Sequence, residues 1–160
     1  MKTSARRRAC LANRNGTALV EVAITLPIFF TFVFGLVEYG RLQLVSNMLQ
    51  AACRNGARLG ATEDVTTAAA RARVQEILSS AMNPEDVTIT VKDASVYDTE
   101  GPYPGTPADY DALPDIELDD AQPRQLFLVR ASVAYNDVAL IPFPVLQGAS
   151  LFGQSLIRHE

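Results

Sequence analysis

Residues 17–37 read TALVEVAITLPIFFTFVFGLV, an almost wholly apolar run with a single charge at Glu21. As an α-helix at about 1.5 Å per residue, such a run reaches about 31 Å, enough to cross the core of a bilayer. The apolar region of a secretory signal is shorter, about 7–15 residues, and a small-residue cleavage site follows it. Here the charged sequence EYGR (residues 38–41) follows instead. The run therefore predicts a transmembrane helix over residues 17–37, in which Pro27 is either a kink at a packing contact or an ordinary membrane-helix proline.

Charge is distributed unevenly along the chain. Residues 1–16 form a basic leader without acids, whose five cations are Lys2, Arg6, Arg7, Arg8 and Arg14. Because positive charge beside a span stays in the cytoplasm, we expect the N-terminus there and the bulk of the chain on the other side of the membrane. Residues 17–160 hold all 18 acids against nine cations, a net charge of −9 that repels a phosphate backbone. Nucleic acid is therefore not an expected partner.

The helix is expected to continue beyond the membrane as a soluble segment, residues 38–60, so that one helix runs from about Ala18 to Leu59. Apolar or small residues recur there at steps of three or four, forming a stripe of Leu42, Val45, Leu49, Ala52, Gly56 and Leu59. Gly60 is a natural end. Ala52, Gly56 and Gly60 also place small residues on one face, which fits either a close contact with another helix or the narrow side of a domain core.

Residues 61–160 predict a small domain outside the cytoplasm. A helix over 66–82 is expected, with Asp64 or Thr66 as its cap and Asn83-Pro84 as its stop. Alternating apolar residues then predict strands over 87–91, 126–135 and 151–157, with 138–141 as a further segment that pairs back after a turn. The expected fold is α+β: a long N-terminal transmembrane helix that extends into a small domain of one further helix on an antiparallel sheet.

An acidic loop rich in Pro and Gly, residues 98–123, separates the first two strands. It contains no cation and eight acids: Asp98, Glu100, Asp109, Asp111, Asp115, Glu117, Asp119 and Asp120. Such hard oxygen ligands suit calcium, but the spacing and the glycine of an EF-hand are missing. A solvated, disordered loop is expected, and neither a metal nor a cofactor is predicted.

Nothing in the sequence marks a catalytic site. His159 is the only histidine and lies one residue from the C-terminus, where chains usually fray, so a nucleophile–histidine pair is not expected. Cys10 and Cys53 would lie on opposite sides of the membrane and are interpreted as small, half-buried residues with no disulfide between them. We therefore do not expect an enzyme.

A glycine closes the basic leader, and a lone carboxylate stands five residues beyond it, in the sequence RNGTALVE (residues 14–21). With the long apolar helix that follows, this resembles the processing site of class IV prepilins. The stretch RNGTALVEVAITLPIFFTFVFGLVEYGRL resembles the TadE/TadF-like minor pilins (pseudopilins) of the tight-adherence (Flp-type, type IV-like) pilus machinery. Downstream, AACRNGARLGA resembles the helix continuation of that family. The resemblance covers about residues 6–60 and implies a pilin-like fold.

The resemblance implies that a prepilin peptidase cleaves after Gly16, so that Thr17 becomes the new N-terminus and Glu21 the fifth mature residue. One departure is Val22, because the family commonly has an aromatic residue directly after the glutamate. The resemblance further implies a single-pass protein of the bacterial inner membrane with its C-terminal domain in the periplasm, or a component of a surface pilus. Its implied partners are other Tad pilins and the inner-membrane assembly platform, and its implied role is pilus assembly, adhesion or secretion.

Physical arguments allow two interpretations of the role of Glu21. A carboxylate in an apolar run costs about 2.5–3.5 kcal/mol at the centre of a membrane helix and less near its end, so it tends to have a partner. In a stack of such helices, the freed ammonium of a neighbour's Thr17 would supply the opposite charge and set the axial register. Otherwise Glu21 is a boundary glutamate that reaches headgroup water, and the protein is an uncleaved single-pass protein whose outer domain binds a ligand or a partner.

Overall fold

The computed structural model describes residues 3–99 and 104–160, with side chains from Gly16 onward. The chain divides into two compact units, Met1–Gly40 and Arg41–Glu160. Helix α1 (Thr3–Gly60) begins in the first unit and ends in the second, and a small helix-and-sheet domain follows it, so the predicted α+β class is confirmed. The predictions for the leader cations, Cys10 and Glu100 lie outside the described side chains.

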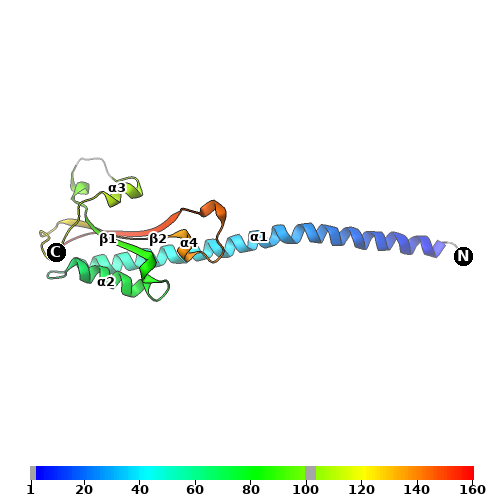
Figure 1. Ribbon diagram of the computed structural model, residues 1–160, viewed down its shortest axis with the longest axis horizontal. Helices are drawn as coiled ribbons and strands as arrows, with labels where there is room; N and C mark the ends of the chain where they lie inside the picture. The colour runs from blue at the N-terminus through cyan, green and yellow to red at the C-terminus, as the bar shows by residue number, and fades with distance from the viewer. Residues whose placement is uncertain (1–2, 100–103) are drawn as a thin grey trace. The chain divides into compact units, whose positions relative to one another are not determined.

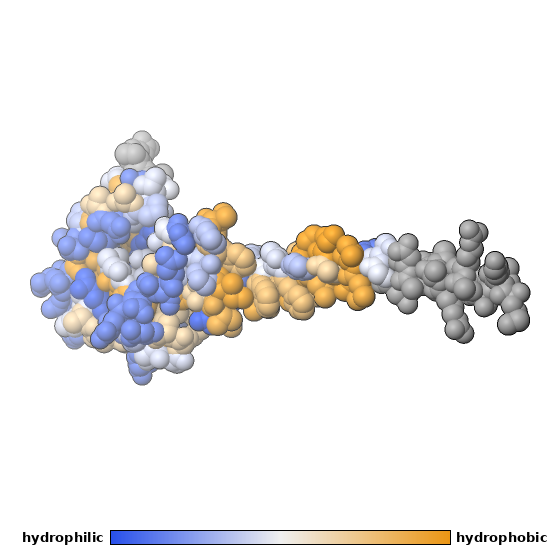
Figure 2. Space-filling model, turned by 45° about the vertical axis from the view of Figure 1, so that its right-hand side comes forward, coloured by the Kyte–Doolittle hydropathy of each residue, from blue (hydrophilic) through white to orange (hydrophobic). Residues whose placement is uncertain are grey.

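The N-terminal unit is helical from Thr3, about 15 residues earlier than the sequence pattern predicted. Its apolar side chains project outward: Leu19 is 71% exposed, and most of residues 17–37 are exposed with it, as the orange surface in Figure 2 shows. At Pro27 the Thr31 hydroxyl donates to the proline carbonyl at 2.8 Å. A helix this long, apolar and exposed meets the requirements of a membrane span, and it indicates a membrane-anchored, single-pass protein.

The C-terminal unit places two helices against an antiparallel sheet. Its main elements are the last part of α1, α2 (Thr67–Leu78), β1 (Val87–Asp93), β2 (Leu126–Ala134) and β3 (Ser150–Arg158). Shorter helices are η1 (Pro84–Asp86), η2 (Ser95–Asp98), α3 (Pro107–Asp111), α4 (Tyr135–Val138) and η3 (Pro144–Leu146). The strand order is β1-β2-β3, and the register pairs Val91 with Val129 and Ala131 with Gly153. In Figure 1 the two long helices lie on one side of the strands and α3 on the other.

The stripe predicted on α1 forms the centre of the core. Val45, Leu49 and Ala52 are buried, whereas Leu59 is exposed, contrary to the prediction. The buried face continues through Gly56 and Ala57 to Gly60, and Leu59 lies beside that face because one residue turns a helix by about 100°. The stripe was therefore predicted correctly except at its two ends, since Leu42 is half-buried and Leu59 is exposed.

Two glycines let α2 and the acidic loop approach α1 closely. A Cβ on Gly56 would collide with the side chain of Val74 on α2, and a Cβ on Gly60 would lie 2.6 Å from Leu118. The row of small residues thus lies in the core of this domain and makes a close contact with α2 there, so both alternatives that the sequence left open hold together. Helix α2 begins after its predicted cap, since the Thr66 hydroxyl accepts a hydrogen bond from the Ala69 amide, but it ends at Leu78, four residues before the predicted limit.

The acidic loop is more ordered than the sequence predicted. In its described parts, Ile116 and Leu118 are buried in the core, and the Thr67 hydroxyl bridges them by donating to the Ile116 carbonyl and accepting from the Leu118 amide. Lys92 of β1 makes a 2.9 Å ion pair with Asp115. The expectation of a solvated, disordered loop is wrong here, because the apolar residues Ile116 and Leu118 of this loop pack into the core of the domain.

Two predictions near the C-terminus are also corrected. Residues 138–141 form no strand, since Tyr135 begins α4 and its hydroxyl donates to the Ile141 carbonyl at 3.1 Å. The chain end is not frayed: the amide of His159 donates to Gln125, and that of Glu160 donates to Ala61, both at 2.9 Å. The His159 ring is buried as a result, and its nitrogens meet no hydrogen-bond partner among the described residues.

Candidate functional site

The two residues predicted to form the processing site and the carboxylate predicted to set the register of assembly lie on one unbroken helix. Gly16, Thr17 and Glu21 all belong to α1 and are exposed. A Cβ on Gly16 would meet nothing within 4 Å, so packing within this fold does not require a glycine there. Thr17 and Glu21 are four residues apart and hence share a face of the helix, whereas Gly16 is turned away from Glu21 by about 140°.

Glu21 is a carboxylate surrounded by exposed apolar side chains. Its neighbours Leu19, Val20 and Val22 are each more than half exposed. The Thr25 hydroxyl donates to the Glu21 backbone carbonyl at 2.8 Å, and in the described part of the chain no cation lies within ion-pair distance of the Glu21 carboxylate. The carboxylate is thus accessible to a partner from outside the chain or to lipid headgroups. The structure is compatible with both interpretations of Glu21, the pairing carboxylate and the boundary glutamate.

A second candidate site, in the C-terminal unit, is built around Arg130 of β2. Arg130 is only 5% exposed, yet no carboxylate of the described residues forms an ion pair with it. Its guanidinium carbon lies 4.8 Å from the ring centroid of Tyr110 and 4.7 Å from that of Phe152, and its Nη1 donates to Gln154 Oε1 at 3.2 Å. The two rings therefore stabilise a buried cation by their negative faces.

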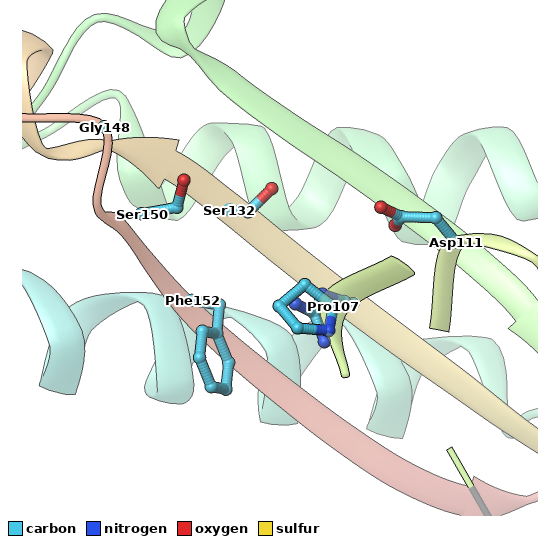
Figure 3. Close-up of a pocket in the computed structure, with 7 residues that line it drawn as sticks. Pro107, Asp111, Ser132, Gly148, Ser150 and Phe152 are labelled. Atoms are coloured by element: carbon cyan, nitrogen blue, oxygen red, sulfur yellow. The ribbon is translucent and has the colours of Figure 1, made fainter. Parts of the chain in front are cut away.

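A cavity of about 280 Å³ adjoins this cation between β2, β3 and α3. It is lined by Pro107, Asp111, Arg130, Ser132, Gly148, Ser150 and Phe152. In Figure 3 the hydroxyls of Ser132 and Ser150 point to the same side, and Asp111 approaches from α3. One cation, one carboxylate and two hydroxyls offer hydrogen bonds to a small polar ligand.

Sequence reasoning missed this site. Arg130 alternates with apolar residues on β2, a pattern that predicts a side chain directed to solvent. What covers it is Tyr110, from the loop that was expected to be disordered. The one available signal was the presence of tyrosines in that loop, and nothing in the sequence linked them to β2.

The described residues contain no group of three His, Cys, Asp or Glu side chains that could hold a metal ion. Cys53 is buried, its thiol donates to the Gly153 carbonyl at 3.2 Å, and burial raises the pKa of the thiol to about 11. The thiol therefore stays protonated at neutral pH and packs as a small apolar group.

The comparisons with known proteins give one match. Residues 16–58 match the family model described as TadE-like protein. No curated protein and no solved structure matches the chain. The family match confirms the resemblance stated from the sequence, over the segment that begins at Gly16 and includes both the apolar run and the helix that forms the domain core. Together with the apolar helix, it fits a pilin associated with a Tad pilus.

Proposed function

We propose, from the TadE-like match at residues 16–58, that this protein is a minor pilin that assists assembly of a Tad (Flp-type) pilus or a related secretion apparatus. In this role it is a structural component and not an enzyme. Its partners are the other pilins of the system and the inner-membrane assembly platform. Its N-terminus lies in the cytoplasm, and its C-terminal domain lies on the outer side of the inner membrane.

One observation carries the proposal: the match begins at Gly16, the residue after which a prepilin peptidase would cut. The glycine has no packing role in the fold, since a side chain there would meet open space. A peptidase that requires a small residue before the cleaved bond would explain why a glycine occurs at position 16. Cleavage would expose the ammonium of Thr17, on the same helix face as the Glu21 carboxylate, so each copy would carry both charges of an intermolecular pair.

The mass and N-terminal sequence of the protein from its native host test this proposal. We expect a chain that begins at Thr17. Gly16→Leu should abolish the cleavage without changing insertion, because the apolar run is untouched, whereas Gly35→Leu, a matched change within the same helix at an open position, should leave cleavage intact. A chain that retains its leader in the native host would contradict processing.

The second candidate function is an uncleaved, membrane-anchored domain that binds a ligand. The cavity beside Arg130 is the observation that favours it, because a buried guanidinium with polar neighbours is a natural ligand contact. Arg130→Met should keep most of the stacking on Tyr110 and Phe152 while removing the charge. Loss of a bound small molecule in native mass spectrometry, from a chain that keeps its leader, would assign the cavity to ligand binding.

A further inference from the structure

The C-terminal unit carries an uncharged segment that is apolar and exposed. No Asp, Glu, Lys or Arg occurs in residues 138–157. Within it, residues 139–147 (ALIPFPVLQ) form a connection between α4 and β3, here called the apolar loop. Val145 is 93% exposed and Leu140 62% exposed, and Leu146 is exposed with them. Apolar side chains gathered on a loop in this way mark a surface that contacts something other than water.

Hydrogen bonds to the domain hold the backbone of the apolar loop in a defined conformation. The Tyr135 ring is buried, and its hydroxyl donates to the Ile141 carbonyl and accepts from the Phe143 amide, both at 3.1 Å. Pro142 and Pro144 restrict the backbone further, and Pro144 begins the short helix η3. The exposure of Val145 and Leu140 is thus built into the fold.

Chain connectivity places this loop near the membrane. The Nε of Arg41 donates to the Val138 carbonyl, directly before the loop, at 2.6 Å. Arg41 is only four residues beyond Val37, where the apolar run ends. Four residues span at most about 14 Å even when fully extended, and about 6 Å as a helix. Whatever the angle between the two units, the start of the loop is therefore within reach of the headgroup layer, which is several Å thick on each side of the bilayer core.

We propose that the apolar loop inserts into the membrane leaflet on the side of the C-terminal domain and acts as a second, interfacial anchor beside the span. Leu140, Val145 and Leu146 bury their side chains at the boundary between headgroups and acyl chains. The occupant of this surface is lipid, since the loop adjoins the end of an apolar span and carries no charge of its own. The inference requires only that the protein is anchored by α1, and it holds whether or not the chain is cut after Gly16.

The absence of tryptophan from the chain allows a direct test. Val145→Trp introduces a single reporter into the loop of the full chain, which is then placed in nanodiscs at one copy per disc. Glu63→Trp is the matched control: it is exposed, it follows the far end of α1, and about 20 residues of helix separate it from Arg41. We expect brominated acyl chains to quench most of the Val145→Trp fluorescence, with a blue-shifted emission, and to leave Glu63→Trp red and unquenched.

A charge placed in the loop tests whether the reporter itself drives insertion. Leu140→Trp should be quenched in the same way, and adding Val145→Asp to it should remove most of the quenching, because a carboxylate opposes burial among acyl chains. Near-UV circular dichroism checks that each variant keeps its fold. Emission at Val145→Trp as red and unquenched as at Glu63→Trp would overturn the proposal. So would a blue shift that appears only when several copies share a disc, because a second copy of the chain would then be the occupant.

Discussion

The side-chain amide of Gln50 on α1 pairs with both backbone polar groups of Gln154 on β3. Its Nε2 donates to the Gln154 carbonyl at 2.8 Å, and its Oε1 accepts from the Gln154 amide at 3.2 Å. One residue away, Gly153 lies against the backbone of Leu49 and Gln50. The helix that continues from the membrane is therefore joined to the sheet by hydrogen bonds as well as by apolar packing.

Gln50→Ala should lower the free energy of unfolding by about 1–3 kcal/mol, because it leaves a half-buried amide and carbonyl of β3 without their partner. Urea unfolding of the detergent-solubilised chain, followed by near-UV circular dichroism, measures this. Asn55→Ala is the control, since its side chain bonds only to the Ala51 carbonyl of the same helix. Equal effects of the two substitutions would contradict the role of Gln50.

Gly153→Ala should destabilise the domain by about 1–3 kcal/mol or more, because the added Cβ would collide with the backbone of Leu49 and Gln50, which cannot move aside as a side chain can. The same unfolding measurement applies. Gly105→Ala should have little effect, since a Cβ there meets open space. A Gly153→Ala variant as stable as the parent would mean that β3 does not lie this close to α1.

Leu118→Ala should cost about 2–5 kcal/mol, because Leu118 is fully buried against Gly60 and its truncation leaves a cavity. The exposed Leu156 provides the comparison, and its replacement by alanine should change stability by less than about 0.5 kcal/mol. If the two variants unfolded at the same urea concentration, the acidic loop would not be part of the core in solution.

Glu21→Gln should leave insertion and cleavage intact and impair assembly. An uncharged residue enters the bilayer more easily, but it cannot pair with the ammonium of a neighbouring Thr17. Processed protein should accumulate in the membrane while pilus number falls, as counted by electron microscopy. Glu63→Gln, outside the span, removes the same charge and should have no effect. Normal pili in the Glu21→Gln strain would make Glu21 a boundary glutamate.

The ion pair between Asp98 and Arg158 should make stability depend on pH. Hydrogen bonds from Arg158 hold the pKa of the Asp98 carboxyl below its usual range, with an Nη2–Oδ1 distance of 2.6 Å. A depressed pKa in the folded state contributes stability above the pKa of the unfolded chain, near 3.9, and this is lost as pH falls through the folded value. Asp98→Asn should therefore unfold more easily than the parent at pH 7, and the difference should shrink as the pH is lowered below the unfolded pKa. Asp120→Asn, an exposed acid of the same loop, should show no such difference.

The sequence predicted those parts of the fold in which one local pattern determines the outcome. The apolar run, the core stripe through Val45 and Leu49, and the alternation in β1, β2 and β3 each follow from a single periodicity. Predictions failed where the burial of a residue depends on contacts with residues far away in the sequence. Leu118 is buried because Gly60 leaves room for it, and His159 because its backbone pairs with Gln125. Arg130 was missed for the same reason, since its partner Tyr110 lies 20 residues away in the sequence.

The pairing of Gln50 with Gln154 also bears on how copies of this protein can join. The outer edge of a sheet is a template on which another chain can add a strand, and proteins that must stay separate block such edges. Here the Gln50 side chain of the helix occupies the middle of the β3 edge, where it satisfies an amide and a carbonyl together. A neighbour could extend the sheet through β3 only by displacing Gln50. Contacts between copies on the β3 side would therefore come from packing between helices and side chains, and such contacts can be released without unfolding the domain.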